Sequence, residues 1–192
     1  SSVFFRFTNY SKGIQICGNS ALFAVAGFCR DDSWARKVME QVDEWRSCLP
    51  MRDTRQAKIE LLRFSGEKLY PAAGGEECFA ALYITERGAA VCVQGDGGVF
   101  RLKKGVLKDI SGRTVEKAAG MSGAVSPANK IDTYVICSAG MLQAIHPEKL
   151  AELLSQPGSC AQRVKKAVDI GKMRTESADV SLVMIQVERR HV

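Results

Sequence analysis

Histidine is scarce in this sequence, and its scarcity limits the catalytic chemistry that the chain can support. The two histidines are His146, which precedes Pro147 and is expected to cap a helix, and His191 near the end of the chain. A cysteine or serine nucleophile activated by histidine needs both side chains placed together by the fold. Nothing in the chain order pairs either histidine with a nucleophile, and Cys29 and Cys48 are expected to be packing residues. Histidine-activated nucleophilic catalysis therefore has little support.

Paired cysteines and long apolar runs are also lacking. The seven cysteines are an odd number and include no C-x-x-C pair, which is typical of a reduced, cytoplasmic protein. No apolar run approaches the roughly 20 residues of a membrane-spanning helix, and no signal-peptide pattern opens the chain. We expect a soluble protein without a membrane partner, which could be one part of a longer chain.

Positive charge is in excess, but it forms no cluster in the sequence. The formal net charge is +6, and the basic residues, among them Arg101, Lys103, Lys108 and Arg189, are scattered. No recognised nucleic-acid-binding module accompanies them, so we expect a solvated surface and no nucleic-acid partner. The length of 192 residues is enough for one well-buried domain, and we expect a single domain over residues 1–192.

The most regular pattern lies in residues 79–111, which contain four short β-rich runs. Breaks at residues 86–88, 95–98 and 104–105 each contain glycine, which supplies the backbone freedom that hairpin turns need. The first run is apolar on both alternating faces and should be covered on both sides. The last two runs alternate apolar and basic residues, as expected near a sheet edge. This pattern predicts an antiparallel meander within one core sheet, with Asp96 in its sharpest turn.

Further strands and helices are predicted on either side of these runs. Strands are expected over residues 1–8, 13–17, 21–26, 133–137 and 180–187. Helices are expected over residues 34–48, 53–66, 147–154 and, after a capping box, 159–170. Residues 111–131 show little periodicity and are predicted to be a loop with one short helical turn at 115–119. This order predicts an α+β fold with sheets between two helical layers.

Four motifs follow one another at the ends of predicted strands. They are Leu-Phe-Ala-Val-Ala-Gly at residues 22–27, the Gly-Asp turn with its flanking strands at 89–107, Ser-Ala-Gly at 138–140 and Ala-Asp before a β-branched strand at 178–183. In this order they resemble the motifs of the metal-dependent PP2C-type protein phosphatases. The resemblance covers most of the chain. It implies a PP2C-like α/β/β/α sandwich, with two mostly antiparallel sheets between two helical layers.

The departures from the family pattern fall where that family binds metal. The resemblance implies two divalent ions, held by a few aspartates and water, that activate a water for attack on a phosphate ester. Here the first aspartate is missing between Ala26 and Gly27, and alanine replaces aspartate at Ala139 and Ala178. Because a methyl group cannot coordinate a metal, Asp96 is the remaining acid of the set.

The other acidic residues are weaker candidates for the missing metal ligands. Asp179 comes one residue late, and a one-residue shift along a strand turns a side chain to the opposite face. Asp31 and Asp32 could reach inward, although helix capping is the simpler interpretation. Asp132 begins a strand and is expected to be a solvated end residue. The family's substrate-binding arginine has no counterpart that aligns, and Arg6 is only a guess.

We interpret the sequence as a catalytically impaired PP2C-like domain, a pseudophosphatase for signalling. It would bind a protein partner, such as a kinase or a phosphoprotein, or regulate a linked domain, and no cofactor is then expected. The alternative is a divergent but active phosphatase for phosphoserine and phosphothreonine, using Mn²⁺ or Mg²⁺ at a site rebuilt from Asp96, Asp179 and either Asp31 or Asp32. The two interpretations differ in whether these carboxylates converge within coordination distance.

Overall fold

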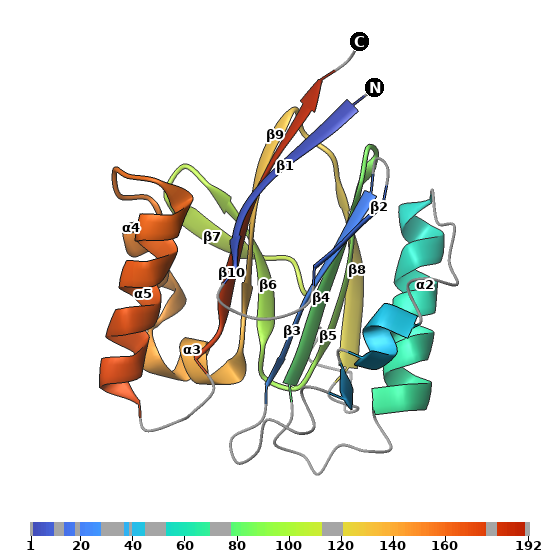
Figure 1. Ribbon diagram of the computed structural model, residues 1–192, viewed down its shortest axis with the longest axis horizontal. Helices are drawn as coiled ribbons and strands as arrows, with labels where there is room; N and C mark the ends of the chain where they lie inside the picture. The colour runs from blue at the N-terminus through green and yellow to red at the C-terminus, as the bar shows by residue number, and fades with distance from the viewer. Residues whose placement is uncertain are drawn as a thin grey trace.

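The computed structural model contains two antiparallel β-sheets packed face to face between helical layers (Figure 1). The structure describes residues 2–9, 14–17, 20–27, 37–38, 40–44, 53–69, 78–112, 121–175 and 180–190. Among these residues, each sheet has five strands, and every strand pairing is antiparallel. The α+β sandwich predicted from the sequence is therefore confirmed.

The strands of the two sheets are interleaved along the chain. From edge to edge, the first sheet contains β1 (Ser2–Asn9), β10 (Leu182–Arg190), β9 (Ile131–Cys137), β6 (Gly98–Lys103) and β7 (Val106–Asp109). The second sheet contains β2 (Ile14–Cys17), β3 (Ser20–Gly27), β4 (Cys78–Thr85), β5 (Gly88–Gln94) and β8 (Met121–Pro127). The helices are α2 (Thr54–Phe64), continued by the π-helical η1 (Ser65–Leu69), then α3 (Ala139–Ala144), α4 (Pro147–Leu154) and α5 (Cys160–Arg174). Residues 37–38 and 40–44 are also helical, within the helix predicted over 34–48.

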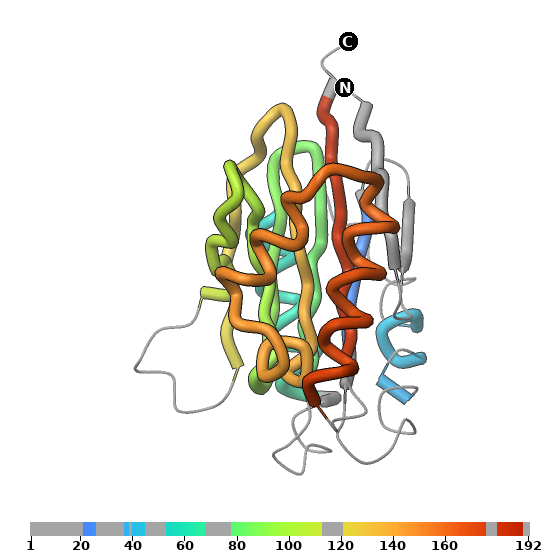
Figure 2. Tube along the Cα trace, turned by 90° about the vertical axis from the view of Figure 1, so that its left-hand side faces the viewer, coloured from blue at the N-terminus to red at the C-terminus, as the bar shows by residue number. Residues whose placement is uncertain are grey.

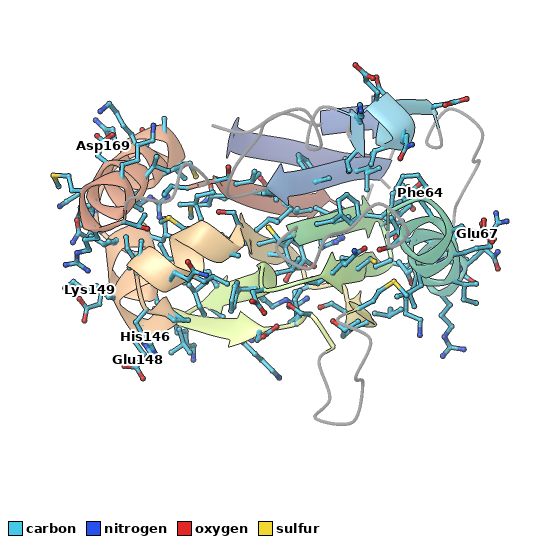
Figure 3. The ribbon with its side chains drawn as sticks, turned by 90° about the horizontal axis from the view of Figure 1, so that it is seen from below. Phe64, Glu67, His146, Glu148, Lys149 and Asp169 are labelled. Carbon is cyan, nitrogen blue, oxygen red and sulfur yellow. The ribbon has the colours of Figure 1, made fainter. Side chains whose placement is uncertain are left out.

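Helices cover the outer face of each sheet. Seen from below, Phe64 and Glu67 lie on one side of the sheets, and Lys149 and Asp169 lie on the opposite side (Figure 3). The view in Figure 2 looks onto α4 and α5, which lie in front of the first sheet. Three apolar clusters fill the spaces: one between α2 and the second sheet, one between the sheets, and one between the first sheet and α3 to α5. The molecule is thus a four-layer sandwich.

Alternating residues of the strands supply these clusters, because successive side chains of a strand point to opposite faces. In β4, Leu82 belongs to the cluster between the sheets and Tyr83 to the cluster beneath α2. Every residue of β4 is buried, as predicted for a strand covered on both sides. A fully buried side chain of this size contributes about 1.5–3 kcal/mol relative to an exposed one. The central strands therefore provide much of the stabilisation of the fold.

Helix boundaries follow capping groups that are visible in the sequence. The Asp53 carboxylate accepts a hydrogen bond of 3.0 Å from Arg55 N, and α2 begins at Thr54, directly after Asp53. At α5, Gln162 N donates to the Ser159 hydroxyl at 3.2 Å and Ser159 N donates to the Gln162 side chain at 2.9 Å, which confirms the predicted capping box. Pro147 begins α4, but the side chain of His146 makes no capping hydrogen bond. Within the described ranges, no helix is long and apolar enough to span a membrane.

The four runs predicted as one meander are divided between the two sheets, which corrects the sequence prediction. β4 and β5 pair in the second sheet, whereas β6 and β7 pair in the first. The chain changes sheet after Gln94, and Gly98 then pairs with Cys137 of β9. A Cβ atom on Gly97 would lie 2.9 Å from the carbonyl oxygen of Cys137, so this close crossing favours glycine. Local turn patterns did not reveal the crossing, because the strand that β6 joins is distant in sequence.

The predicted loop over residues 111–131 contains the edge strand β8, which is a second correction. The buried residues of β8 are Ser122 and Ser126, so the strand lacks the hydrophobic alternation that would have identified it. Gly123 allows the Leu62 side chain to approach, since an added Cβ would lie 3.0 Å from its methyl carbons. The helical turn predicted at residues 115–119 lies outside the described residues.

Candidate functional site

Strand pairing gathers the motif segments at one end of the sandwich, which we call the motif end. It is the end of the sandwich at which α3 lies (lower part of Figure 1). Gly27, the last residue of β3, pairs with Cys78 at the start of β4. Cys137, the last residue of β9, pairs with the first residue of β6 and with the first residue of β10. Gly97 lies close to strand ends of both sheets, because a Cβ on it would be 2.9 Å from Cys137 O and 3.5 Å from Cys78 Sγ.

Asp96 is exposed in the turn between β5 and β6. On one side of it, Gly95 has a φ of 73°, a left-handed conformation that glycine adopts readily. Before that residue, the buried Gln94 side chain accepts a hydrogen bond of 2.9 Å from the Ser65 hydroxyl, which joins the end of β5 to η1. Gly97 follows Asp96 and is buried. The turn thus carries a carboxylate at the surface between two anchored strand ends.

Ser138 and Ala139 form the junction between β9 and α3. The Ser138 hydroxyl accepts hydrogen bonds from Met141 N at 3.3 Å and from Ser181 N at 3.0 Å, while Ser138 N donates to Ser181 O at 3.0 Å. Ser138 therefore caps α3 and fixes it to the segment that enters β10. Ala139, which the motif resemblance predicts to replace an aspartate, is the first residue of α3 and is half-buried. The strand, the capping serine and the helix expected around this motif are present, and the side chain at position 139 is a methyl group.

Several predicted site residues cannot be placed relative to Asp96. Asp31, Asp32, Ala178 and Asp179 lie outside the described residues. Arg6 lies in β1, opposite Gln186 of β10, and only its backbone is described. Whether Asp179 faces the motif end therefore stays a prediction.

The described donors at the motif positions do not fit a divalent metal. Magnesium takes about six oxygen ligands, including one or two carboxylates, and manganese favours similar oxygen ligands. Of the described motif residues Gly27, Asp96 and Ala139, only Asp96 has a carboxylate. No group of three or more histidine, cysteine, aspartate or glutamate side chains in the described parts of the chain could hold a metal ion. We therefore derive no metal-dependent step from these residues.

A thiol at the motif end is also unsuited to nucleophilic catalysis. Burial, with a smaller contribution from neighbouring Cys78, raises the pKa of Cys137 far above that of an ordinary thiol. The nucleophilic form of cysteine is the thiolate. Cys137 therefore stays protonated at neutral pH and acts as a small apolar residue of the core.

At the opposite end of the sandwich, three strands bring charged residues into the space between the sheets. These residues are Arg101 of β6, Asp132 of β9 and Arg189 of β10. They lie two residues along their strands from Val99, Tyr134 and Val187, respectively, which all belong to the cluster between the sheets. Because side chains two apart share a face, the inward direction of these charges follows from the alternation. The sequence prediction counted Arg101 and Arg189 among the scattered surface charges and did not use this alternation.

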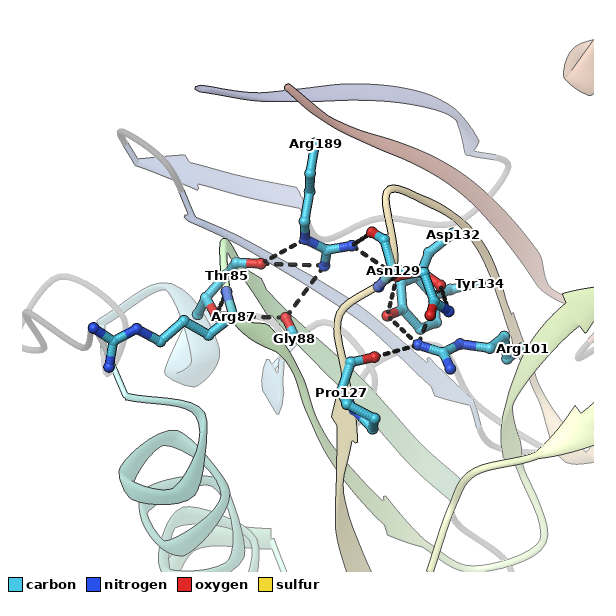
Figure 4. A network of polar contacts seen from close by, with 9 residues as sticks. All are labelled: Thr85, Arg87, Gly88, Arg101, Pro127, Asn129, Asp132, Tyr134 and Arg189. Carbon is cyan, nitrogen blue, oxygen red and sulfur yellow. Dashed lines mark hydrogen bonds and ion pairs between the residues drawn. The ribbon is translucent and has the colours of Figure 1, made fainter. Parts of the chain in front are cut away.

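Asp132 is buried between the two guanidinium groups (Figure 4). Its Oδ2 lies 2.7 Å from Arg189 Nη1, and its Oδ1 lies 3.1 Å from Arg101 Nη2. Asn129 donates from N and Nδ2 at 3.0 and 2.9 Å, and the Tyr134 hydroxyl donates at 3.2 Å. Burial raises the pKa of Asp132, but the hydrogen bonds from Asn129 and Arg189 and the charge of Arg101 together hold it below the usual value of 3.8. The expectation that Asp132 is a solvated end residue is therefore wrong.

Arg189 also joins the two sheets. Its Nε and Nη2 donate to the carbonyl oxygen of Thr85, at the end of β4, at 3.2 and 3.1 Å. Its Nη1 donates to the carbonyl oxygen of Asn129 at 2.9 Å. We call this group the Arg189 clasp; its members are Thr85, Gly88, Arg101, Asn129, Asp132, Tyr134 and Arg189 (Figure 4). Arg189 lies in the first sheet, and its contacts to backbone carbonyls of the second sheet and of the loop between β8 and β9 indicate a structural role.

Comparison with known proteins identifies the fold. No family model matches the sequence, and no curated protein matches it either. Solved structures do match over nearly the whole chain, and they define the class: the chain has the fold of the PP2C-type serine/threonine protein phosphatases. The resemblance inferred from the four motifs is thus confirmed at the level of the fold.

Three of the similar structures show that the fold is shared over almost the whole chain at low sequence identity. One is PppA, a key regulatory component of T6SS in Pseudomonas aeruginosa, with 18% identity, a TM-score of 0.64, and 98% of each chain covered. Another is the S. agalactiae serine/threonine phosphatase, with 12% identity, a TM-score of 0.67, and 97% of this chain and 100% of that chain covered. A third is the catalytic domain of the phosphatase PstP in complex with two manganese ions, with 14% identity, a TM-score of 0.64, and 97% and 98% covered.

Proposed function

We propose that residues 1–192 form a single PP2C-like domain that has lost metal-dependent phosphatase activity and acts as a regulatory module. Its role is to bind a protein partner, either a kinase or a phosphoprotein. The observation that carries this proposal is Ala139, which begins α3 at the motif end where the family pattern has an aspartate. Ser138 caps α3 at this point, whereas the side chain of Ala139 has no oxygen that could bind a metal, which supports a domain with the fold but without the hydrolysis.

The relationship to PppA supports the regulatory part of the proposal. That protein is described as a regulatory component of a secretion system, and this chain shares its fold over nearly its full length. The PstP catalytic domain holds two manganese ions, so the fold can carry a metal centre when its ligands are present. The alanine at position 139 removes one carboxylate from the corresponding motif in this chain.

Metal titration combined with an activity assay tests the proposal. Isothermal titration calorimetry with Mn²⁺ and Mg²⁺ should show no saturable binding, and turnover of an aryl phosphate and of a phosphopeptide should not depend on metal. The physical reason is that the described motif residues supply one carboxylate, which without further protein or phosphate oxygens holds a divalent ion only weakly. Saturable metal binding together with metal-dependent turnover that Asp96→Ala abolishes would establish the active-phosphatase alternative instead.

A gain-of-ligand variant tests the same proposal from the other direction. Ala139→Asp combined with Ala178→Asp should increase the affinity for Mn²⁺, because it restores two carboxylates at the motif positions. Ala161→Asp, on the exposed face of α5, adds a carboxylate away from the motif end and serves as the control. If the double variant binds metal no better than this control, alanine at these positions is not the reason for lost metal binding.

A further inference from the structure

One face of the β6–β7 hairpin carries a row of basic side chains. Lys108 of β7 pairs with Arg101 of β6, and Lys103 lies two residues further along β6, opposite Val106. Partner residues in an antiparallel pair share a face, and so do residues two apart in one strand. Arg101, Lys103 and Lys108 therefore extend from the same face, which we call the cation face. Lys103 and Lys108 are exposed, and Val106 between them is 63% exposed.

Positive charge on and beside the cation face exceeds the negative charge that contacts it. Arg101 shares its carboxylate partner, Asp132, with Arg189. Within the part of the chain that the structure describes, neither Lys103 nor Lys108 forms an ion pair. Like charges directly opposite each other on neighbouring strands destabilise the pairing, and Arg101 and Lys108 are such a pair. The carboxylate of Asp132 thus contacts Arg101 and Arg189 but neither lysine, and an anion beside the lysines would relieve the repulsion.

Arg101 also has an unused hydrogen-bond donor. Its Nη2 donates to the Tyr134 hydroxyl at 3.4 Å and to the carbonyl oxygen of Pro127. Its Nε is buried and has no hydrogen-bond acceptor among the described residues. A buried donor without an acceptor costs about 1–3 kcal/mol, and such groups are rare in native structures. The excess charge and the unused donor therefore occur on the same side chain.

We propose that the cation face binds a phosphate-type oxyanion. The two lysines hold the anion from the solvent side, and Arg101 supplies positive charge beneath them. Lysine and arginine together suit a dianion with several acceptor oxygens, because charge-assisted hydrogen bonds to phosphate are stronger than neutral ones. The anion is either inorganic phosphate or the phosphoryl group of a phosphorylated peptide, and both share this chemistry. The site lies along β6 away from the turn that holds Asp96, so it does not depend on the function proposed for the motif end.

Titration of the whole chain with inorganic phosphate, at constant ionic strength and followed by ¹H–¹⁵N NMR, tests the proposal. Saturable shifts should concentrate on the amides of residues 99–109. The Lys103→Ala/Lys108→Ala variant should weaken the apparent affinity by about tenfold or more, because two charge-assisted contacts are lost. The control is Lys149→Ala/Lys165→Ala, which removes the same charge from two lysines that are paired with Glu152 and Asp169. It should bind phosphate as the unmodified chain does, and the dispersion of each spectrum reports whether the variant is folded.

The result that overturns the proposal is equal weakening in both double variants, or shifts spread evenly over all lysines, since either indicates general charge attraction. Shifts confined to the turn at Asp96 would also overturn it, and would point to anion binding at the motif end. A phosphoserine peptide and its unphosphorylated form distinguish the two sources. Tighter binding of the phosphopeptide than of phosphate identifies a phosphoprotein, and equal affinity identifies free phosphate.

Discussion

Among single residues, Asp132 shows how a buried charge is accommodated in this fold. Removing a carboxylate from water is costly unless hydrogen bonds and opposite charges compensate. Here two guanidinium groups, the Asn129 amide groups and the Tyr134 hydroxyl surround it. Such a cluster need not be more stable than an apolar one of the same shape, but removing one member leaves the remaining charges unpaired. Asp132 is therefore the residue on which the Arg189 clasp depends.

The variant Asp132→Asn should destabilise the protein strongly at neutral pH. It leaves Arg101 and Arg189 without their shared counter-charge, and breaking a buried pair in this way costs about 3–5 kcal/mol. Because the pKa of Asp132 is lowered in the folded state, its stabilisation is fully present above the ordinary value of 3.8 and is lost as the pH falls through the folded pKa. Urea unfolding followed by circular dichroism should thus show a large difference from the unmodified chain at pH 7 that shrinks in acid.

Asp169→Asn provides the matched control for this prediction. Asp169 pairs with Lys165 at 2.6 Å, but both side chains are more than half exposed, and exposed pairs contribute little. Its free energy of unfolding should stay close to that of the unmodified chain at both pH values. A difference between Asp132→Asn and the unmodified chain that is small at pH 7, or that grows in acid, would contradict the structural role given to the clasp.

At the scale of secondary-structure elements, the crossing from β5 to β6 determines where Asp96 lies. The turn sits between two sheets, and Gly97 fits between Cys137 of one sheet and Cys78 of the other. A methyl group at this position would meet a backbone carbonyl oxygen, which cannot move aside as a flexible side chain can. The strand that follows the turn is then aligned by its pairing with β9. The crossing is therefore a point of tight packing.

Gly97→Ala should lower the free energy of unfolding by about 1–3 kcal/mol, the usual cost of overpacking a well-packed site. The reason is the 2.9 Å approach between the new Cβ and Cys137 O. Gly66→Ala is the control, because its Cβ would lie 3.7 Å from the nearest side-chain carbon and alanine favours helical backbone. Thermal unfolding should show a lower Tm for Gly97→Ala and an equal or higher Tm for Gly66→Ala. Equal Tm values for Gly97→Ala and the unmodified chain would show that the crossing is looser than described.

For the whole molecule, the three apolar clusters indicate that the layers should unfold together. Cys92 lies in the cluster beneath α2, Cys137 lies in the cluster beneath α3 to α5, and the third cluster joins the sheets that carry them. Burial raises the pKa of Cys92 to about 12, with a smaller opposing effect from the Ser65 hydrogen bond, and raises the pKa of Cys137 further. Both thiols are therefore protected by the intact sandwich.

Pulsed alkylation with iodoacetamide in increasing urea, read by peptide mass spectrometry, tests this cooperativity. Cys92 and Cys137 should become reactive with the same urea midpoint, because neither can be exposed without separating a layer from the shared core. The half-buried Cys160 provides an internal control and should react before unfolding. Separate midpoints for Cys92 and Cys137 would argue against one cooperative domain over residues 1–192.

Much of the fold could be predicted from local patterns, but the strand pairings could not. Strands such as β4 and β9 and the start of α5 were predicted because alternation and capping are encoded within a few residues. β8 was missed because its buried residues are serines, and its position depends on pairing with β5 and on Leu62 packing against Gly123. The Arg189 clasp was missed because each of its charges resembles a surface charge when it is considered alone.

The sequence by itself determined which residues alternate, where helices begin, and that alanine stands at positions 139 and 178 of the motif pattern. Only the tertiary structure decided that β4–β5 and β6–β7 belong to different sheets, and that Asp132 is buried between two arginines. The physical reason is that periodicity records which face of a strand is apolar, whereas the partner of that strand depends on contacts between residues far apart in the chain.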